Sequence, residues 1–109
     1  MLSSRDLTTA ERLRIERRRS STTQAQAAHE RGVSLVDYKA AESGAKSNLR
    51  VAVGRLAPHE ICFILRRRSG WTLDELSARV DLTKHWLCQI ERGRAPHSSL
   101  FHFWEQQSA

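Results

Sequence analysis

The chain has 109 residues, 39% of them hydrophobic, which is enough for one compact domain or two very small ones. No apolar run is long enough to cross a membrane and no apolar stretch follows the first residues, so we expect no secretory signal and a cytoplasmic, nucleoid-associated protein. The formal net charge of +6 favours a polyanionic partner, of which nucleic acid is the usual one.

The two cysteines, Cys62 and Cys88, are too far apart in the sequence to form a C-x-x-C pair. They predict two free thiols in a reducing compartment rather than a zinc site or a redox motif. We therefore expect neither a metal nor a cofactor.

An internal repeat organises the sequence. A shift of 49 residues aligns positions 7–44 with 56–93 without a gap, and ten of the 38 aligned positions are identical. The block Arg-Arg-Arg-Ser recurs in full. The repeat predicts two copies of one supersecondary unit, with domain ranges 1–50 and 51–109. The identical pairs are Leu7/Leu56, Glu11/Glu60, Ile15/Ile64, Arg17/Arg66, Arg18/Arg67, Arg19/Arg68, Ser20/Ser69, Thr23/Thr72, Glu42/Glu91 and Gly44/Gly93.

Helix-start patterns mark the first copy. Capping boxes at Thr8, Thr23 and Ser34 predict three successive helices, because each places a hydroxyl three residues before an acidic or amide side chain. Gly32 suits the sharp turn between the second and third helices. The stretch 45–55 joins the copies, and we expect a short helix over 48–53. Nothing in the sequence predicts a strand.

The second copy begins with two more helices. Pro58 suits the first turn of the first one, and Ser69-Gly70 marks its end. Thr72 and Glu75 form the capping box of the next helix. The apolar residues predict the buried faces of both helices. They are Ile61, Ile64 and Leu65 in the first helix, and Leu73, Leu76 and Val80 in the second, with Trp71 and Leu76 at the staple positions.

A third and a fourth helix complete the second copy. Asp81 is expected to make the turn, because Asp tolerates the left-handed backbone, and Thr83 caps the third helix. Gly93 ends it. A last, aromatic helix begins near Ser98. We predict a core position for all three tryptophans, and we place Trp86, Leu87 and Ile90 on the inner face of the third helix.

This spacing of helix, tight turn and helix is that of the unit that lays one helix in the DNA major groove. The stretch 65–94, with Thr72-Leu73-Asp74-Glu75 near its middle and Ile90-Glu91-Arg92-Gly93-Arg94 at its end, resembles the Cro/lambda-repressor-like (XRE) helix-turn-helix family. The match covers about 61–104. It implies an all-α helix-turn-helix bundle for this half, although Asp81 stands where the family usually has Gly. Together with the repeat, the sequence predicts an all-α fold of two tandem helix-turn-helix bundles.

The resemblance also implies a role for eight residues. Thr72 would touch a phosphate at a helix N-terminus. On the outer face of the third helix, Lys84 would bind a guanine edge and Gln89 would make paired bonds to adenine. Arg92 and Arg94 would hold phosphates. The full predicted set is Thr72, Thr83, Lys84, His85, Cys88, Gln89, Arg92 and Arg94.

The first copy lacks this chemistry. Its third helix would present Leu35, Val36, Lys39 and Ala40, and an exposed apolar pair more often marks a protein contact. We interpret this copy as a degenerate helix-turn-helix used for packing, dimerisation or a partner. The alternative is a second reading head, which a run of arginines favours: Arg12, Arg14, Arg17, Arg18 and Arg19.

The sequence therefore predicts a sequence-specific DNA-binding transcriptional regulator, a repressor rather than an activator. The alternative is an antitoxin or antiactivator on the same fold, with the first copy holding a protein partner. We do not expect an enzyme, because no Gly-rich phosphate loop, paired acidic cluster or nucleophile-histidine arrangement is present. A homodimer on double-stranded DNA and a single-chain pseudo-dimer both stay open.

Overall fold

The computed structural model describes residues 2–107, and within that range the chain is entirely helical, with no strand. The all-α fold class is therefore confirmed. No helix in this range has both the length and the apolar character needed to span a membrane. The chain forms two compact units, each with most of its contacts within itself. We call them the N-terminal unit (Ser4–Arg55) and the C-terminal unit (from Leu56 onward).

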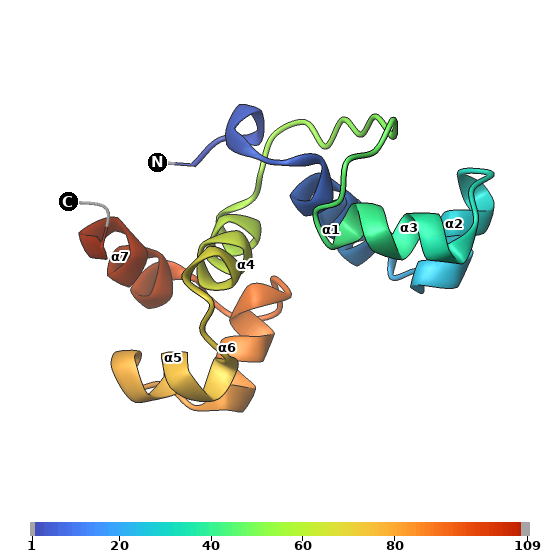
Figure 1. Ribbon diagram of the computed structural model, residues 1–109. Helices are drawn as coiled ribbons and strands as arrows, with labels where there is room; N and C mark the ends of the chain where they lie inside the picture. The colour runs from blue at the N-terminus through green and yellow to red at the C-terminus, as the bar shows by residue number, and fades with distance from the viewer. Residues whose placement is uncertain (1, 108–109) are drawn as a thin grey trace. The chain divides into compact units, whose positions relative to one another are not determined.

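The N-terminal unit has three α-helices after a short 3-10 helix at Ser4–Asp6 (Figure 1). They are α1 (Thr9–Ser20), α2 (Gln24–Glu30) and α3 (Leu35–Glu42). The predicted capping boxes at Thr8 and Thr23 are confirmed, since in each the hydroxyl accepts a backbone N–H and the side chain three residues later accepts the N–H of the cap. At Ser34 only the first of these two bonds is present, so that box is half formed.

The predicted short helix over 48–53 is wrong. The chain has no regular secondary structure between α3 and the next helix, as the green stretch in Figure 1 shows. Val51 and Val53 are buried while Arg50 and Ala52 are exposed, an alternation typical of extended backbone rather than of a helix. Carbonyl groups of this segment accept hydrogen bonds from the side chains of Arg19 and Arg31, where a helix would use its own backbone N–H groups.

The C-terminal unit has four α-helices: α4 (Pro58–Ser69), α5 (Leu73–Val80), α6 (Lys84–Glu91) and α7 (Ser98–Gln107). Their predicted starts are confirmed at Pro58, Thr72, Thr83 and Ser98. Gly70 ends α4 in the left-handed conformation, with φ +73°. The core of the unit consists of Cys62, Leu76, Leu87, Ile90, Leu100 and Trp104.

Two predictions about this core need correction. Trp86 is 43% exposed, so it does not belong to the inner face of α6. Cys62 and Phe63 are buried, whereas Ile61 and Leu65 in the predicted stripe are only half-buried. Helix α4 contacts both α6 and α7, and Cys62 is its buried residue in the core that these helices share.

The first three helices of the two units follow the same plan. Helices α1, α2 and α3 each begin 49 positions before α4, α5 and α6, which is the shift of the sequence repeat. The turn before the third helix of each unit holds a residue with positive φ, Gly32 at +68° and Asp81 at +56°. Helix α7 has no counterpart, because the extended segment stands at the corresponding positions of the N-terminal unit.

Candidate nucleic-acid interface

The turn between α5 and α6 is short and closed by its own hydrogen bonds. Asp81 ends α5 in the left-handed region, and its N–H donates to the carbonyl of Ser77 at 3.2 Å. The hydroxyl of Ser77 donates to the carbonyl of Leu82, and the hydroxyl of Thr83 accepts the N–H of Trp86 at 3.1 Å. These bonds fix the angle at which α6 leaves the turn.

One side of α6 is anchored in the core and the other faces solvent. Leu87 and Ile90 are fully buried and Glu91 is 3% exposed. A helix turns by about 100° per residue, so the line opposite these three residues runs through His85, Gln89 and Arg92. The side chains of His85 and Gln89 lie 3.5 Å apart at their Nε2 atoms, as expected for neighbours on one face.

Of the predicted base-facing residues, His85 and Gln89 lie on this line and Cys88 lies beside it, whereas Lys84 projects about 100° away from His85 and Thr83 is the cap before the helix. Thr83, Lys84 and His85 are exposed, while Cys88 and Gln89 are half-buried. The Oε1 atom of Gln89 is buried and accepts no hydrogen bond from the described residues. The position of Trp86 beside this face was missed, because hydrophobic periodicity assigns any tryptophan to the core.

A buried ion pair attaches α6 to α4. The Nε atom of Arg66 donates to both carboxylate oxygens of Glu91, at 3.1 and 2.8 Å, and its Nη1 atom donates to the carbonyl of Trp71 at 3.0 Å. The side chains are 14% and 3% exposed. Arg66 is thus used inside the unit rather than toward a phosphate, and the pair sets the position of α6 relative to α4.

The same pair recurs in the N-terminal unit. Arg17 donates to Glu42 from Nη2 at 2.8 Å and from Nε at 3.0 Å, and to the carbonyl of Thr22 at 3.4 Å. Burial alone would raise the pKa of Glu42, but the hydrogen bonds and charge of Arg17, with the charge of Arg14, hold that pKa below its ordinary value. The sequence reasoning did not pair these residues, although both positions are identical between the copies.

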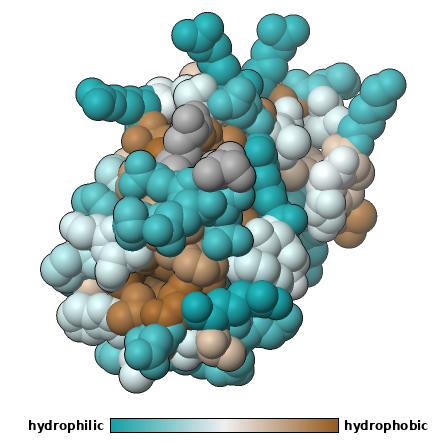
Figure 2. All heavy atoms as spheres, turned by 90° about the vertical axis from the view of Figure 1, so that its left-hand side faces the viewer, coloured by the Kyte–Doolittle hydropathy of each residue, from teal (hydrophilic) through white to brown (hydrophobic). Residues whose placement is uncertain are grey.

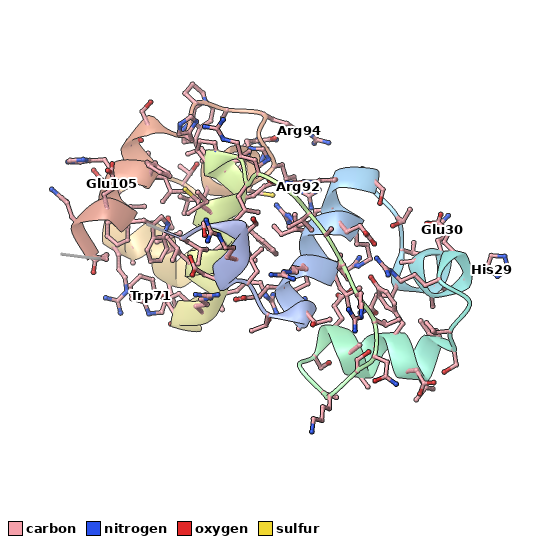
Figure 3. The ribbon with its side chains drawn as sticks, turned by 90° about the horizontal axis from the view of Figure 1, so that it is seen from above. His29, Glu30, Trp71, Arg92, Arg94 and Glu105 are labelled. Atoms are coloured by element: carbon pink, nitrogen blue, oxygen red, sulfur yellow. The ribbon has the colours of Figure 1, made fainter. Side chains whose placement is uncertain are left out.

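Basic and hydroxyl groups flank the outer face of α6. Arg92 and Arg94 follow the helix (Figure 3), and both are exposed with no side-chain ion pair or hydrogen bond to the described residues. Lys84 lies 3.5 Å from Asp74, but the side chains are 61% and 74% exposed, so water screens this pair and Lys84 can exchange its partner. Thr72 caps α5, and its hydroxyl accepts the N–H of Glu75, which leaves its hydrogen for an outside acceptor.

An aromatic cluster fixes the last helix beside the start of α5. The rings of Trp71 and Trp104 stack with centroids 5.6 Å apart, and Phe103 lies edge-on to Trp104. The guanidinium of Arg79 lies 4.2 Å above the ring of Trp71, a cation–π contact. The core prediction thus holds for Trp104 and, half-buried, for Trp71. Figure 2 shows apolar side chains among hydrophilic ones on the α7 side of this unit.

The corresponding face of α3 has a different character. Val36 is 76% exposed and Leu35 38% exposed, and Lys39 and Ala40 are exposed as well. These are the four residues that the sequence placed there. Val36 and Ala40 on α3 stand 49 positions before His85 and Gln89 on α6. The two faces therefore occupy corresponding positions, but at these two positions only α6 carries side chains that form hydrogen bonds.

Several arginines of the N-terminal unit have partners inside the unit. Arg14 lies 3.6 Å from Glu42, beside the Arg17 pair, and Arg12 donates to the carbonyl of Ser4 at 3.0 Å. Arg19 donates to carbonyl groups of the extended segment. Inward contacts of this kind reduce the number of arginines that a second reading head would have available.

Both cysteines are free, and no disulfide joins them. Burial raises the pKa of the Cys62 thiol to about 12, helped by the nearby charge of Glu91. Cys88 is half-buried on the flank of α6. The described residues contain no group of three or more His, Cys, Asp or Glu placed to hold a metal ion.

No protein-family model matches the chain, and neither does any curated protein or solved structure compared with it.

Proposed function

We propose that the chain is a sequence-specific regulator of transcription that lays α6 in the major groove of double-stranded DNA. One observation carries the proposal: α6 is anchored by Leu87, Ile90 and Glu91, and its opposite side presents hydrogen-bonding groups in a row. A helix held from one side by a core and polar along the other meets the steric and chemical requirements for reading base edges.

The groups around this row suit the parts of a DNA duplex. The Nε2 atom of Gln89 can donate to the N7 atom of adenine, and its Oε1 atom, which is buried here, can accept from N6 once the side chain rotates outward. The ammonium of Lys84 can bind the O6 and N7 atoms of guanine. Arg92 and Arg94 are exposed cations at the end of α6 and suit phosphates. The start of α5 offers the hydroxyl of Thr72 as a donor to a phosphate, while Asp74 and Glu75 in the first turn oppose the attraction of the helix dipole for an anion.

A regulator of this size would act by occupying a promoter, so we propose a repressor that works in the cytoplasm. Two chains would bind half-sites one DNA turn apart as a homodimer. Sequences selected from a random DNA pool distinguish the arrangements. A palindromic selected sequence indicates a symmetric dimer. Two unlike sequence elements in the selected DNA indicate that both units of one chain recognise bases.

The decisive test compares two glutamines in matched settings. Gln89 on α6 and Gln106 on α7 each lie four residues after a histidine whose ring they contact. We expect Gln89→Ala to weaken binding to the selected duplex by about 5- to 150-fold, the equivalent of 1–3 kcal/mol for one base-pair contact, and Gln106→Ala to have no effect. Fluorescence anisotropy measures both. Equal effects of the two variants, or no preference for any duplex, would refute the proposal.

A second candidate rests on the exposed apolar pair of α3. Val36 and Leu35 favour a protein-binding antitoxin or antiactivator that holds a partner with the N-terminal unit. Under this alternative, Leu35→Asp with Val36→Asp abolishes activity in the cell and Lys84→Ala leaves it intact. The DNA-reading proposal expects the opposite pattern.

A further inference from the structure

The positive charge is unevenly divided between the units. Residues 4–55 hold eleven of the 18 lysines and arginines and six of the 12 acidic residues, a net charge of +5. Residues 56–109 hold the other seven basic and six acidic residues, a net charge of +1. The unit with the polar face of α6 is therefore nearly neutral, and the excess belongs to the unit whose α3 face is apolar.

Part of the N-terminal charge is neutralised inside the unit. Glu42 is paired with Arg17 and Arg14, and Glu16 with Arg31. Other cations remain exposed, so the surface of the unit keeps an excess of positive charge. The exposed lysines and arginines of the unit are Arg5, Arg19, Lys39, Lys46, Arg50 and Arg55.

Three of these exposed cations lie on the extended segment. Between Glu42 and Glu60 the sequence contains Lys46, Arg50 and Arg55 and no acidic residue. We call residues 45–55 the basic segment. Lys46, Arg50 and Arg55 are exposed and lie four and five residues apart, so they present positive charge at intervals along the segment.

The backbone of the basic segment is held in place by the helices. Arg31, at the end of α2, donates to the carbonyl of Arg50 at 3.4 Å. Arg19, near the end of α1, donates to the carbonyl of Arg55 at 3.0 Å and to that of Val53. A segment that is ordered before it binds loses less conformational entropy on binding, which favours contact by its exposed cations.

We propose that the basic segment is a second DNA contact, which binds phosphates without reading sequence. The inference rests on the proposed function: α6 supplies the discrimination and the N-terminal unit supplies electrostatic affinity. Duplex DNA is favoured over an anionic membrane, because Val51 and Val53 are buried and a surface that inserts into lipid needs exposed apolar side chains.

The test removes the three charges and restores them in another form. The neutral variant carries Lys46→Gln, Arg50→Gln and Arg55→Gln, and the charge-keeping variant carries Lys46→Arg, Arg50→Lys and Arg55→Lys. Affinity is measured on a selected duplex and on a scrambled one between about 50 and 200 mM salt. Circular dichroism checks that both variants keep the helical content of the parent.

We expect the neutral variant to reduce the salt slope by up to about 2.7 on both duplexes, at about 0.9 for each phosphate contact. The parent then loses about 40-fold more affinity than this variant across the salt range. The ratio of affinities for the selected and scrambled duplexes stays constant, and the charge-keeping variant behaves as the parent.

Three results would overturn the inference. They are an unchanged slope in the neutral variant, an effect on the selected duplex alone, and tighter binding to phosphatidylcholine vesicles with one quarter phosphatidylglycerol than to the scrambled duplex. The proposed function fails separately. If no sequence is preferred but the neutral variant flattens the slope on the scrambled duplex, the basic segment stands as a DNA contact and the reading role of α6 does not.

Discussion

The ion pair between Arg66 and Glu91 gives the most direct test of what positions α6, through the substitution Glu91→Gln. Glutamine has nearly the size of glutamate and keeps an acceptor oxygen, but it removes the negative charge. The guanidinium of Arg66, 14% exposed, then loses its charged partner while it keeps its bond to the carbonyl of Trp71. The perturbation therefore acts on charge rather than on packing.

The expected cost follows from burial. Breaking a buried ion pair costs about 3–5 kcal/mol of unfolding free energy. We expect the lower end, about 3 kcal/mol, because Arg66 is partly exposed and glutamine keeps one acceptor oxygen for it. A unit of this size has a total free energy of unfolding of about 3–8 kcal/mol. With an m-value of about 1 kcal/mol/M, the urea midpoint should fall by about 3 M, and affinity for DNA should fall with it because α6 loses its attachment.

Tryptophan fluorescence reports on the C-terminal unit alone, because Trp71, Trp86 and Trp104 all follow residue 56. Far-UV circular dichroism follows both units. The matched control is Glu42→Gln, which breaks the corresponding pair of the N-terminal unit. It should shift the circular dichroism transition and leave the fluorescence midpoint in place. A fluorescence midpoint that Glu91→Gln does not move, or that Glu42→Gln moves equally, would refute the reasoning.

Two further predictions concern pH and packing. The folded pKa of Glu42 lies below its unfolded value of about 4.3, so its stabilisation is present above that value and is lost as the pH falls through the folded pKa. The difference in circular dichroism midpoint between parent and Glu42→Gln should therefore shrink on acidification, and a constant difference would contradict this. Trp104→Ala should cost about 3–5 kcal/mol in urea unfolding, and Trp86→Ala, at a side chain 43% exposed, about 1 kcal/mol; equal losses would contradict the difference in burial.

Local patterns predicted the helix boundaries well, because capping depends on residues three apart. Thr8, Thr23, Thr72 and Thr83 all cap helices where the sequence places them. The positions of α5 and α6 in the candidate site follow from these helix starts and from the turn at Asp81. Exposure of Val36 on α3 was likewise predictable, since a short helix has one buried side.

Features that depend on distant partners were not predicted. Hydrophobicity alone predicted a core position for Trp86. The sequence does not show that Leu87 and Ile90 already fill the buried side of α6, so the exposure of Trp86 was missed. The expected helix over 48–53 failed because side chains of Arg19 and Arg31 satisfy that backbone from other helices. The Arg66–Glu91 pair spans 25 residues and was not predicted, although both positions are identical between the two copies of the repeat.

The duplicated ion pair separates what the chain needs in order to fold from what it needs in order to recognise. Arg17–Glu42 and Arg66–Glu91 lie on the inner sides of their units, and neither uses a residue of the outward line on α3 or α6. Substitutions along that line can accumulate without loosening the frame. One copy can therefore carry Val36 and Ala40 on this line while the other carries His85 and Gln89, so the same scaffold can serve two different partners.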